Sequence, residues 1–560
     1  MKLVECVPNF SEGRNLKVIK SITDQVDKVP GVKLLDVDPG ADTNRTVVTF
    51  IGTPDGVAEA AFQVIKKASE VIDMSKHTGG HARQGATDVC PFVPVAGVTM
   101  EACVEIAKKV GKRVGVELEI PIYLYEEAAT RPERRSLPDI RVGEYEALSE
   151  KLKKPEWKPD FGPAKFNAKA GVTVIGAREF LIAYNVNLNT KDKKLAHDIA
   201  LTIRERGRFK RDKNKKIVKD ENGKKIKVPG LLKECKAVGW YIEEYSQAQI
   251  SINLTNYNIT PIHVAFDVAR KEARKRGLRV TGSEIVGLTP KQALLDAGYY
   301  YLKKQKRSEA IPESDIIDIA IKSMGLSDIT EFCPEKKIIE YQFENDCDKL
   351  VGLTIRGFNN ILSTDAPAPG GGSVAALCGS MAASLDAMVA NLTFGKKRYE
   401  KYWNRVNLLG VQAQKLKDEM LDLIDKDTDA FNEVMAAMKV KAKTDDEKKD
   451  KDNLIQEKTK NATLIPLTVM KKSLEILQVS KKIIKYGNKN SISDVGVSAV
   501  CCEAAAESAY LNVLINLPGI EDKKFKDNTL EEAREIKRNV SLLSKKIIKN
   551  LEKSLESEIT

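Results

Sequence analysis

Several structural classes are excluded by what this sequence lacks. Cysteine is sparse and irregularly placed: nine cysteines are spread over 560 residues, and Cys501 and Cys502 are adjacent. Secreted domains that depend on disulfides show a regular framework instead, so reduced and mostly buried thiols are expected. The N-terminus, Met1-Lys-Leu-Val-Glu-Cys, lacks a basic segment followed by an apolar one, which predicts no signal peptide and a cytoplasmic location.

Long apolar runs are missing as well. The longest stretch of low charge, residues 370–394, contains Asp386, Asn391 and several serines, and it is rich in alanine and glycine rather than leucine. It is expected to form a tightly packed buried helix, and no membrane partner is predicted.

Acidic residues are outnumbered by basic ones. There are 91 Lys and Arg residues against 79 Asp and Glu, which gives a net charge of +12. Such an excess can attract nucleic acid or other polyanions. Much of it lies in the Lys-rich segments 210–227 and 439–451, and neither interleaves aromatic residues with the basic ones, as proteins that bind single strands do. Solvated surfaces are therefore expected, with no nucleic-acid partner.

Length and patterning predict a multidomain chain. Residues 1–178 and 179–326 are each expected to form an α/β subdomain of α+β sandwich-like architecture, because short β-branched strands alternate with periodic helices. Strand signals then fade, and Ala, Leu, Lys and Met dominate long periodic stretches. Residues 346–560 are therefore expected to form an all-α helical bundle, with 327–345 as a linker.

Turn and cap signals place individual elements. Asn222-Gly223 lies between two short β-branched runs and predicts a hairpin within 216–228. Because open α/β sheets bind ligands at strand ends, Asn9 and Asp38 are candidate site residues. Strands are expected at 3–7, 32–37, 46–51, 180–188 and 248–254, and helices at 54–72, 195–206 and 261–277.

The most chemically informative stretch is His77-Thr-Gly-Gly-His81-Ala-Arg83-Gln-Gly-Ala-Thr-Asp88. The chain has four histidines, and two of them lie here. Histidine titrates near neutral pH, which suits proton transfer. The surrounding glycines let the backbone approach a ligand closely, and Arg83 and Asp88 add fixed charges. Together these residues predict general acid–base chemistry on an anionic substrate.

Three simpler interpretations of this stretch stay open. A histidine pair four residues apart is half of a metal site when it lies on a helix, but the glycines disfavour a helix and no third ligand follows at a suitable spacing. No metal is therefore predicted. Either histidine, His77 more readily than His81, could be a hydrogen-bonded core residue. Arg83 could pair with Asp88 at the surface, an interaction that contributes little.

A second candidate site lies in the helical region. Pro367-Ala-Pro369-Gly370-Gly371-Gly372-Ser373 precedes a long predicted helix, and glycines at a helix N-terminus expose backbone N–H groups where the dipole favours anions. No Gly-Lys-Ser/Thr follows, so this is not a Walker loop. The alternative is a hinge that also lets helices pack closely.

Asp425-Lys-Asp427-Thr-Asp429 falls where the pattern predicts helix. Asp425 and Asp429 share a face, and Asp427 lies toward the opposite side. A carboxylate that faces the interior of the bundle has a raised pKa and can act as a general acid. A fully solvated acidic helix fits the pattern equally well.

These stretches together resemble one known family. The first 325 or so residues closely resemble the formiminotransferase (glutamate formimidoyltransferase) domain, and residues 346–560 resemble the cyclodeaminase domain, in the order of the bifunctional formimidoyltransferase-cyclodeaminase family. The resemblance is carried by Leu3-Val-Glu-Cys-Val-Pro-Asn-Phe-Ser-Glu-Gly-Arg14, Leu34-Leu-Asp-Val-Asp-Pro-Gly40, Thr43-Asn-Arg-Thr-Val47, Asp88-Val-Cys-Pro-Phe-Val-Pro-Val95, Pro369-Gly-Gly-Gly-Ser-Val-Ala-Ala376 and Asp425-Lys-Asp-Thr-Asp-Ala-Phe431.

The resemblance implies two consecutive reactions, in histidine degradation and one-carbon metabolism. N5 of tetrahydrofolate takes the formimino group of N-formimino-L-glutamate, and N10 then closes onto the transferred carbon with loss of ammonia, giving 5,10-methenyltetrahydrofolate. By resemblance, His81 is the transferase acid/base, Asp38 orients it, and Asp427 protonates the departing ammonia. Tetrahydrofolate is a co-substrate, no metal is required, and a homo-oligomer is implied.

Substrate and folate contacts are assigned by a combination of resemblance and chemistry. The segment that matches the family's folate contacts runs from residue 162 to 171. The other residues are candidates because of their charge or their position in the motifs. The expected binding residues are Asn9, Arg83, Gly162, Pro163, Ala164, Lys165, Phe166, Asn167, Gly171, Arg178, Gly370, Gly371, Gly372 and Ser373.

Two features depart from the family pattern. The family usually has His-Pro-Arg-Met-Gly where this chain has His81-Ala82-Arg83-Gln84-Gly85, and alanine in place of proline loosens the loop. The Lys-rich hairpin at 211–228 looks like an insertion. It could contact the γ-linked glutamate tail of a folate or a neighbouring subunit, or be a tolerated surface insertion. The positive net charge suggests that such a tail is held while the product moves between sites.

Other functional interpretations stay open. The transferase could be the only activity, with the helical domain as an oligomerisation module. The net charge alone would fit a nucleic-acid-binding protein, which a steep salt dependence would reveal. A formyl group, rather than a formimino group, could be the unit transferred.

Overall fold

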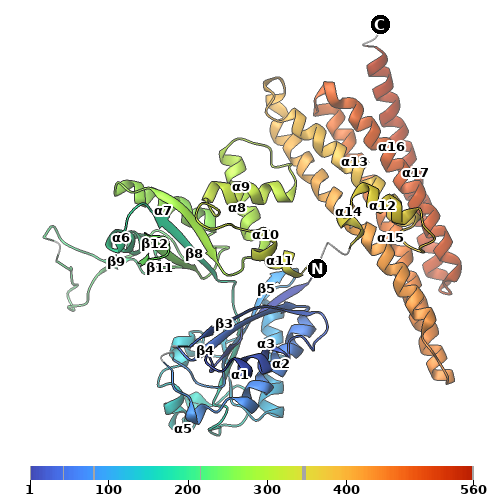
Figure 1. Cartoon of the computed structure of the whole chain (residues 1–560). Helices are drawn as coiled ribbons and strands as arrows, with labels where there is room; N and C mark the ends of the chain where they lie inside the picture. Colours follow the sequence, from blue (N-terminus) through green and yellow to red (C-terminus); the bar gives the residue numbers. More distant parts are fainter. Residues whose placement is uncertain (1, 42, 80–81, 215, 344–348, 558–560) are drawn as a thin grey trace. The chain divides into compact units, whose positions relative to one another are not determined.

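The computed structural model describes residues 2–41, 43–79, 82–214, 216–343 and 349–557 (Figure 1). The chain forms two compact units. The first comprises Met1–Ala293 with Met324–Glu344, and the second comprises Leu294–Ser323 with Asn345–Thr560. A region with two β-sheets is followed by a largely helical region, in the predicted order.

The first sheet is mixed and mainly antiparallel. Its strands are β1 (Leu3–Cys6), β2 (Asn9–Phe10), β3 (Val32–Gly40), β4 (Arg45–Gly52), β5 (Thr87–Ala96), β6 (Ile122–Glu126) and β7 (Thr173–Ala177). Strands β1 and β2 follow each other between β4 and β5, β3 lies outside β4, and β7 lies between β5 and β6. Only the pairs of β7 are parallel. The strands expected at 3–7, 32–37 and 46–51 are confirmed.

Helices cover the two faces of this sheet unequally. Residues of α1 (Leu16–Thr23), α2 (Pro54–Val71) and α3 (Met100–Glu117) share one hydrophobic core with one face. The short helices α4 (Leu137–Ile140) and α5 (Leu148–Lys151) cover part of the other face. The predicted cap of α2 is confirmed, because Thr53 Oγ1 accepts a hydrogen bond from the N–H of Gly56 at 3.3 Å. The remainder of the second face carries the polar groups described below.

Two expected placements in this sheet are wrong. The rule that ligands bind at strand ends applies to open parallel sheets, whereas β3, β4 and β2 form antiparallel pairs. Asn9 is the first of the two residues of β2, where it pairs with Val47 and Val89. Asp38 lies inside β3, opposite Val47. Both residues therefore belong to one row across an antiparallel sheet rather than to a shared edge where parallel strands end.

The second sheet of this unit is antiparallel throughout. Its strands are β8 (Ile182–Leu188), β11 (Cys235–Ile242), β12 (Gln247–Leu254) and β13 (Val280–Val286), in the order β11-β12-β8-β13. Helices α6 (Lys193–Ile203) and α7 (Ile262–Lys275) pack against it. The expected strands at 180–188 and 248–254 are confirmed, whereas α6 ends three residues before the predicted Arg206. Four further helices follow: α8 (Lys291–Lys304), α9 (Glu313–Met324), α10 (Pro334–Lys337) and α11 (Ile339–Phe343).

A Lys-rich arm, residues 208–228, projects between α6 and β11 (Figure 1). Its base is the ribbon β9 (Arg208–Phe209) and β10 (Lys227–Val228). The predicted hairpin is confirmed: Lys219 lies opposite Lys225, and Gly223 adopts a φ of +76° between them.

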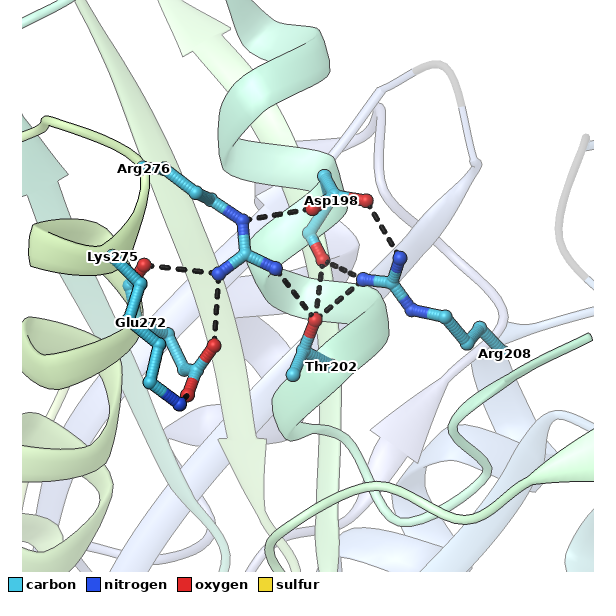
Figure 2. Close-up of polar contacts among 6 residues, drawn as sticks. All are labelled: Asp198, Thr202, Arg208, Glu272, Lys275 and Arg276. Carbon is cyan, nitrogen blue, oxygen red and sulfur yellow. Dashed lines mark hydrogen bonds and ion pairs between the residues drawn. The ribbon is translucent and has the colours of Figure 1, made fainter. Parts of the chain in front are cut away.

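Figure 2 shows how the base of the arm is attached to the helices. Arg208 Nη1 donates to Asp198 Oδ1 at 2.8 Å, and Arg276 Nε donates to Asp198 Oδ2 at 2.8 Å. Both guanidinium groups also reach the hydroxyl of Thr202. Glu272 accepts from Arg276 at 2.8 Å and thereby extends the network along α7. Because one carboxylate joins the arm to both α6 and α7, the root of the arm is held at a fixed place.

The second unit contains a helical bundle, as predicted. Its long helices are α13 (Gly371–Thr393), α14 (Trp403–Lys439), α15 (Asp445–Tyr486), α16 (Ile492–Asn516) and α17 (Lys523–Glu556), preceded by α12 (Ile355–Leu362). The segment expected to be a charged loop or a frayed helix end, 439–452, is mostly helical. A capping box between Thr444 and Glu447 starts α15 at Asp445, so only 440–444 connect the two helices.

Helix α13 forms the centre of the bundle. It packs against α14, α15 and α16, and alanines and Gly379 allow the close approach. It is the one helix in the described ranges whose length and composition would suffice to cross a membrane, and most of it is buried inside the bundle. The expectation of a tightly packed buried helix is confirmed. The eight cysteines that the structure describes are free, and most are buried, as expected.

Among the described residues of the bundle, a single carboxyl group, that of Asp386, is fully buried in the core. Its Oδ2 accepts a hydrogen bond from Ser480 Oγ at 2.6 Å, and its Oδ1 has no hydrogen-bond partner within the described ranges. Burial raises the pKa of Asp386 to about 8, although hydrogen bonds from Ser480 and Ser498 oppose the shift. The carboxyl group is therefore protonated at neutral pH.

This burial predicts a specific pH dependence of stability. The pKa of Asp386 in the folded state is above its unfolded value of about 4. The stability that Asp386 contributes is therefore complete below about pH 4 and is lost as the pH rises through about 8. Asp386→Asn keeps the shape of the protonated acid and removes the titration. Between pH 5 and pH 8, the free energy of unfolding should fall more steeply for the unsubstituted chain than for the variant, by on the order of 3 kcal/mol. Chemical denaturation at several pH values, with the exposed Asp527→Asn as control, measures the difference, and parallel pH profiles would contradict it.

Candidate active sites

The histidine loop, residues 77–85, is fixed at its N-terminal end by Asn44. His77 Nε2 lies 2.9 Å from the carbonyl oxygen of Asn44, and Asn44 Nδ2 donates to the carbonyl of Thr78 at 2.9 Å. Gly79 packs so closely against Thr43 and Asn44 that a Cβ there would overlap them. The predicted acid/base residue His81 and its neighbour Gly80 lie outside the described residues.

The C-terminal end of the histidine loop is fixed by two other segments. Ser11 Oγ donates to the carbonyl of Gly85 at 2.7 Å. The N–H of Val172 donates to the carbonyl of Gln84 at 3.0 Å, and Gly85 forms a β-bridge with Gly171. Both ends of the loop are therefore held by parts of the chain that are distant in sequence.

His77 is a structural member of this loop. Arg83 Nε donates to His77 Nδ1 at 3.3 Å, so Nδ1 is an acceptor. The proton then resides on Nε2, which donates to the carbonyl of Asn44. Both ring nitrogens of His77 are therefore hydrogen-bonded, as the core interpretation expected, but the side chain is only half-buried and lines a cavity.

Arg83 is engaged by carboxylates that are about 60 residues away in sequence. Its guanidinium binds Glu146 through two bonds of 2.7 and 3.0 Å and Glu144 through one of 3.0 Å, and its side chain is 11 % exposed. These partners, Glu146 first, raise the pKa of Arg83 against the effect of burial. A polar cavity of about 560 Å³ opens here, lined by His77, Thr78, Gly79, Arg83, Gly143, Glu144 and Glu146.

The surface pair between Arg83 and Asp88 that the sequence allowed is wrong. Asp88 is buried, accepts a hydrogen bond from the N–H of Gln84 at 2.8 Å, and forms an ion pair with Arg141. Burial and the nearby Arg141 lower the pKa of Arg45, and Asp88 and Asp38 oppose this shift. Two cations and two carboxylates therefore gather at this edge of the sheet.

Asp38 and Asn9 lie on the same face of the sheet, because both pair with Val47. Asp38 is exposed and therefore accessible to a ligand. Asn9 is buried, and its Nδ2 donates to the carbonyl of Val7 at 2.9 Å. Its Oδ1 is also buried and has no hydrogen-bond partner among the residues that the structure describes.

The expected folate segment, residues 162–171, is an irregular and largely exposed loop. Gly162 and Gly171 bracket it, with φ values of +79° and +68°. Asn167 closes a turn in which its Oδ1 accepts from the N–H of Ala170 at 2.9 Å, and the carbonyl of Ala170 then binds the N–H of Ala86 at 2.8 Å. The C-terminal end of the segment thus lies against the histidine loop. The intervening residues, none of them fully buried, are Pro163, Ala164, Lys165 and Phe166.

Arg178 is not brought to the histidine loop. It lies at the far end of β7 from Gly171, a separation of about 20 Å along a strand. It lines a larger cavity of about 840 Å³, whose other basic residues include Arg135, Arg204, Arg206 and Lys236, from both sheets of the unit. Buried Glu5 is close by: burial raises its pKa to about 7, and Arg178 opposes the shift. Apart from its place in the N-terminal motif, no sequence signal pointed to Glu5.

The second candidate site lies where α13 begins beside α14. Ser373 is fully buried, and its hydroxyl lies 2.9 Å from the carbonyl of Ile424 and 3.4 Å from Asp427 Oδ2. A Cβ on Gly372 would overlap the Asp427 carboxylate, so glycine is needed there. Gly371 faces Asn512 of α16, and Gly370 borders open space. The structure therefore brings the glycine-rich segment and Asp427 together.

The three carboxylates on this turn of α14 differ in environment. Asp427 is half-buried, and burial raises its pKa, opposed by hydrogen bonds from Ser373. Asp425 is also half-buried with a raised pKa, but the N–H of Leu350 binds its Oδ1 at 2.7 Å. Asp429 is exposed. Only Asp427 therefore combines an inward position with a place at the N-terminus of α13.

Two chemically different sites on two separately folded units define a bifunctional class of protein. Family models match three successive parts of the chain: the formiminotransferase domain, N-terminal subdomain, matches residues 3–178, the formiminotransferase domain matches 183–344, and formiminotransferase-cyclodeaminase matches 354–535. Relatives cover the whole chain or either half. A formimidoyltransferase-cyclodeaminase of Dictyostelium discoideum is 44% identical over 98% of this chain and 99% of its own length.

Two further relatives each match only part of the chain. A glutamate formimidoyltransferase of Streptococcus pyogenes is 45% identical over 54% of this chain and 94% of its own length. A methenyltetrahydrofolate cyclohydrolase of Methylorubrum extorquens is 35% identical over 35% of this chain and 93% of its own length. The chain belongs to the formimidoyltransferase-cyclodeaminase family.

The close approach of α13 and α14 makes Gly372 a sensitive position. Gly372→Ala should push the new methyl group into Asp427 and lower the free energy of unfolding by about 1–3 kcal/mol. Gly370→Ala is the matched control, because nothing lies within 4 Å of a Cβ there. Chemical denaturation of both variants tests this geometry, and equal stabilities would show that the Asp427 carboxylate does not lie against Gly372.

Proposed function

We propose that this chain transfers the formimino group of N-formimino-L-glutamate to N5 of tetrahydrofolate and then cyclises the product to 5,10-methenyltetrahydrofolate with release of ammonia. The α/β unit performs the transfer and the bundle performs the cyclisation. The observation that carries the proposal is the pairing of each chemically distinct site with its own family model and its own single-activity relative.

In the transfer step, N5 attacks the formimino carbon and the amino group of glutamate leaves with a proton. We assign the proton transfer to His81 and its orientation to Asp38, which the exposed position of Asp38 supports. Arg83 already binds His77 and two glutamates, so it positions the loop unless a substrate carboxylate displaces one of them.

In the cyclisation step, N10 adds to the formimino carbon, the C–NH₂ nitrogen gains a proton, and ammonia departs. We assign that proton to Asp427. A carboxyl group whose pKa is raised by burial retains its proton closer to neutral pH, and this supports a general-acid role. The N-terminus of α13 offers a place for an anionic part of the folate.

The first test mixes the protein with tetrahydrofolate and N-formimino-L-glutamate and follows methenyltetrahydrofolate absorbance together with ammonia. Both signals should rise in parallel. Release of glutamate without ammonia would favour the alternative in which the helical unit is an oligomerisation module. If neither product appears, N-formyl-L-glutamate tests the formyl-transfer alternative.

Substitution of Asp427 separates the two activities. Asp427→Asn should reduce ammonia release from 5-formiminotetrahydrofolate about 10²- to 10⁴-fold, because the general acid is lost, and leave glutamate release unchanged. The exposed Asp429→Asn, two residues along the same helix, is the matched control. Equal cyclisation rates for the two variants would remove Asp427 from the mechanism.

We further propose that the folate carries a γ-linked glutamate tail and that the arm attracts it. The arm has ten basic and three acidic residues, a net charge of +7 out of the chain's +12. Asp212 and Asp220 each accept two backbone N–H groups and so shape turns rather than neutralise lysines. Residues that flank the arm, Arg204, Arg206 and Lys236, line the larger cavity of the same unit. A tail that extends from the transferase site into this cavity would lie close to the root of the arm.

Reversal of two facing charges tests the role of the arm. Lys219→Glu with Lys225→Glu should raise the KM for a pentaglutamyl folate about 3- to 10-fold at low salt and leave the monoglutamate value unchanged. The control makes the same change of charge elsewhere, at the exposed Lys441 and Lys449. If the unsubstituted protein treats both folates equally, the tail proposal is wrong.

A cytoplasmic homo-oligomer completes the proposal. Leu511 and Ile515 of α16 and Leu542 of α17 are large apolar side chains that are 64%, 76% and 63% exposed. Their exposure supports a second copy of the chain as a partner of the bundle. Analytical ultracentrifugation measures the assembly, and a strictly monomeric protein would contradict this part of the proposal.

A further inference from the structure

Asn44 connects three segments that meet at the transferase site. Its Oδ1 accepts a hydrogen bond from the N–H of Gly13 at 3.0 Å, and its Nδ2 donates to the carbonyl of Thr78 at 2.9 Å. Its own carbonyl oxygen accepts from His77 at 2.9 Å. One residue therefore binds the 11–15 segment, the β3–β4 turn and the histidine loop at once.

The backbone of Asn44 restricts which residue can make these bonds. Its φ is +49°, in the left-handed region that asparagine tolerates better than most residues, and it is buried. The side chain must also donate on one side and accept on the other, which an amide does and a carboxylate does not. Glycine would accept the backbone geometry but lose both side-chain bonds.

The contacts of Asn44 continue to the polar groups of the site. Asp38 and Asp88 oppose the lowering of the pKa of the next residue, Arg45. Gly13 is packed so tightly against Gly40 and Arg45 that a Cβ there would overlap their backbone. His77, which binds the carbonyl of Asn44, in turn holds Arg83 through its Nδ1. A displacement of Asn44 would therefore affect His77 and Thr78 directly and Arg83 through His77.

We infer that Asn44 is a positioning residue of the transferase site: its amide fixes the histidine loop against the strands that carry Asp38 and Asn9. It contacts no reacting atom and acts through the loop. The inference rests on the proposed function. It assigns a role to Asn44, which the sequence motif Thr43-Asn-Arg by itself did not suggest.

The test compares Asn44→Gly with Asn15→Ala. Asn15 caps α1 with two comparable hydrogen bonds, to the N–H groups of Lys17 and Val18, and is exposed, so it controls for a general loss of stability. Asn44→Gly should lower kcat for formimino transfer about 30- to 100-fold, with a smaller change in KM for N-formimino-L-glutamate, because a displaced acid/base group affects the chemical step most. The acid limb of the pH profile of kcat should also move.

Two further readouts separate positioning from stability. Cyclisation of added 5-formiminotetrahydrofolate, measured on the same samples, should be equal in both variants, since Asp427 lies in the other folded unit. Backbone hydrogen exchange of residues 77–86 should accelerate in Asn44→Gly and stay unchanged in Asn15→Ala. Asn44→Asp keeps the acceptor for Gly13 and should be intermediate in kcat.

Equal kcat values, pH profiles and exchange rates for Asn44→Gly and Asn15→Ala would overturn the inference. An unsubstituted protein that cyclises but does not transfer would instead refute the proposed transfer reaction. The exchange experiment then still decides whether Asn44 holds the loop.

Discussion

A glycine-rich loop cannot hold a histidine in place by itself, because its backbone has many accessible conformations and no repeating hydrogen bonds. The α/β unit is organised around this constraint. The histidine loop is bound at one end by Asn44 and at the other by Ser11 and the Gly171 turn. Arg83 then fastens His77 to two glutamates of a third segment. The order of the loop is thus supplied from outside it, by residues whose own strands are fixed by the sheet.

The helical unit meets the opposite requirement with rigid elements. Two packed helices place Asp427, and the absence of a side chain at Gly372 leaves room for its carboxylate. Helical geometry alone did not identify which carboxylate faces the interior of the bundle. In the structure, Asp425 and Asp427 are both half-buried. Their hydrogen bonds separate them: the backbone N–H of Leu350 occupies Asp425, whereas Asp427 faces the start of α13.

Much of this architecture could be predicted from sequence, since β-branched strands, the Thr53 cap and the Asn222-Gly223 turn are local signals. The helical bundle followed from its periodicity in the same way. The prediction that Asn9 and Asp38 lie at the ligand-binding edge of a parallel sheet failed because it assumed parallel pairing, which only the sheet as a whole determines. The partners of Arg83 and Asp88 were missed for a related reason. Glu144, Glu146 and Arg141 come from a segment more than 50 residues away that reaches the site only by packing on the sheet.

The two sites also differ in how they treat charge, and the proposed chemistry explains the difference. In the α/β unit the buried Asp88 is paired with Arg141 and Arg83 with two glutamates, so charges there fix geometry. Asp427 lacks a cation among its described contacts, and burial raises its pKa. Transfer of a formimino group between two nitrogens needs well-placed reactants above all, whereas expulsion of ammonia needs a carboxyl group that still holds its proton. A single site could not meet both demands, because a cation that anchors a carboxylate also lowers its pKa and so removes its proton. This conflict favours two separately folded units in one chain.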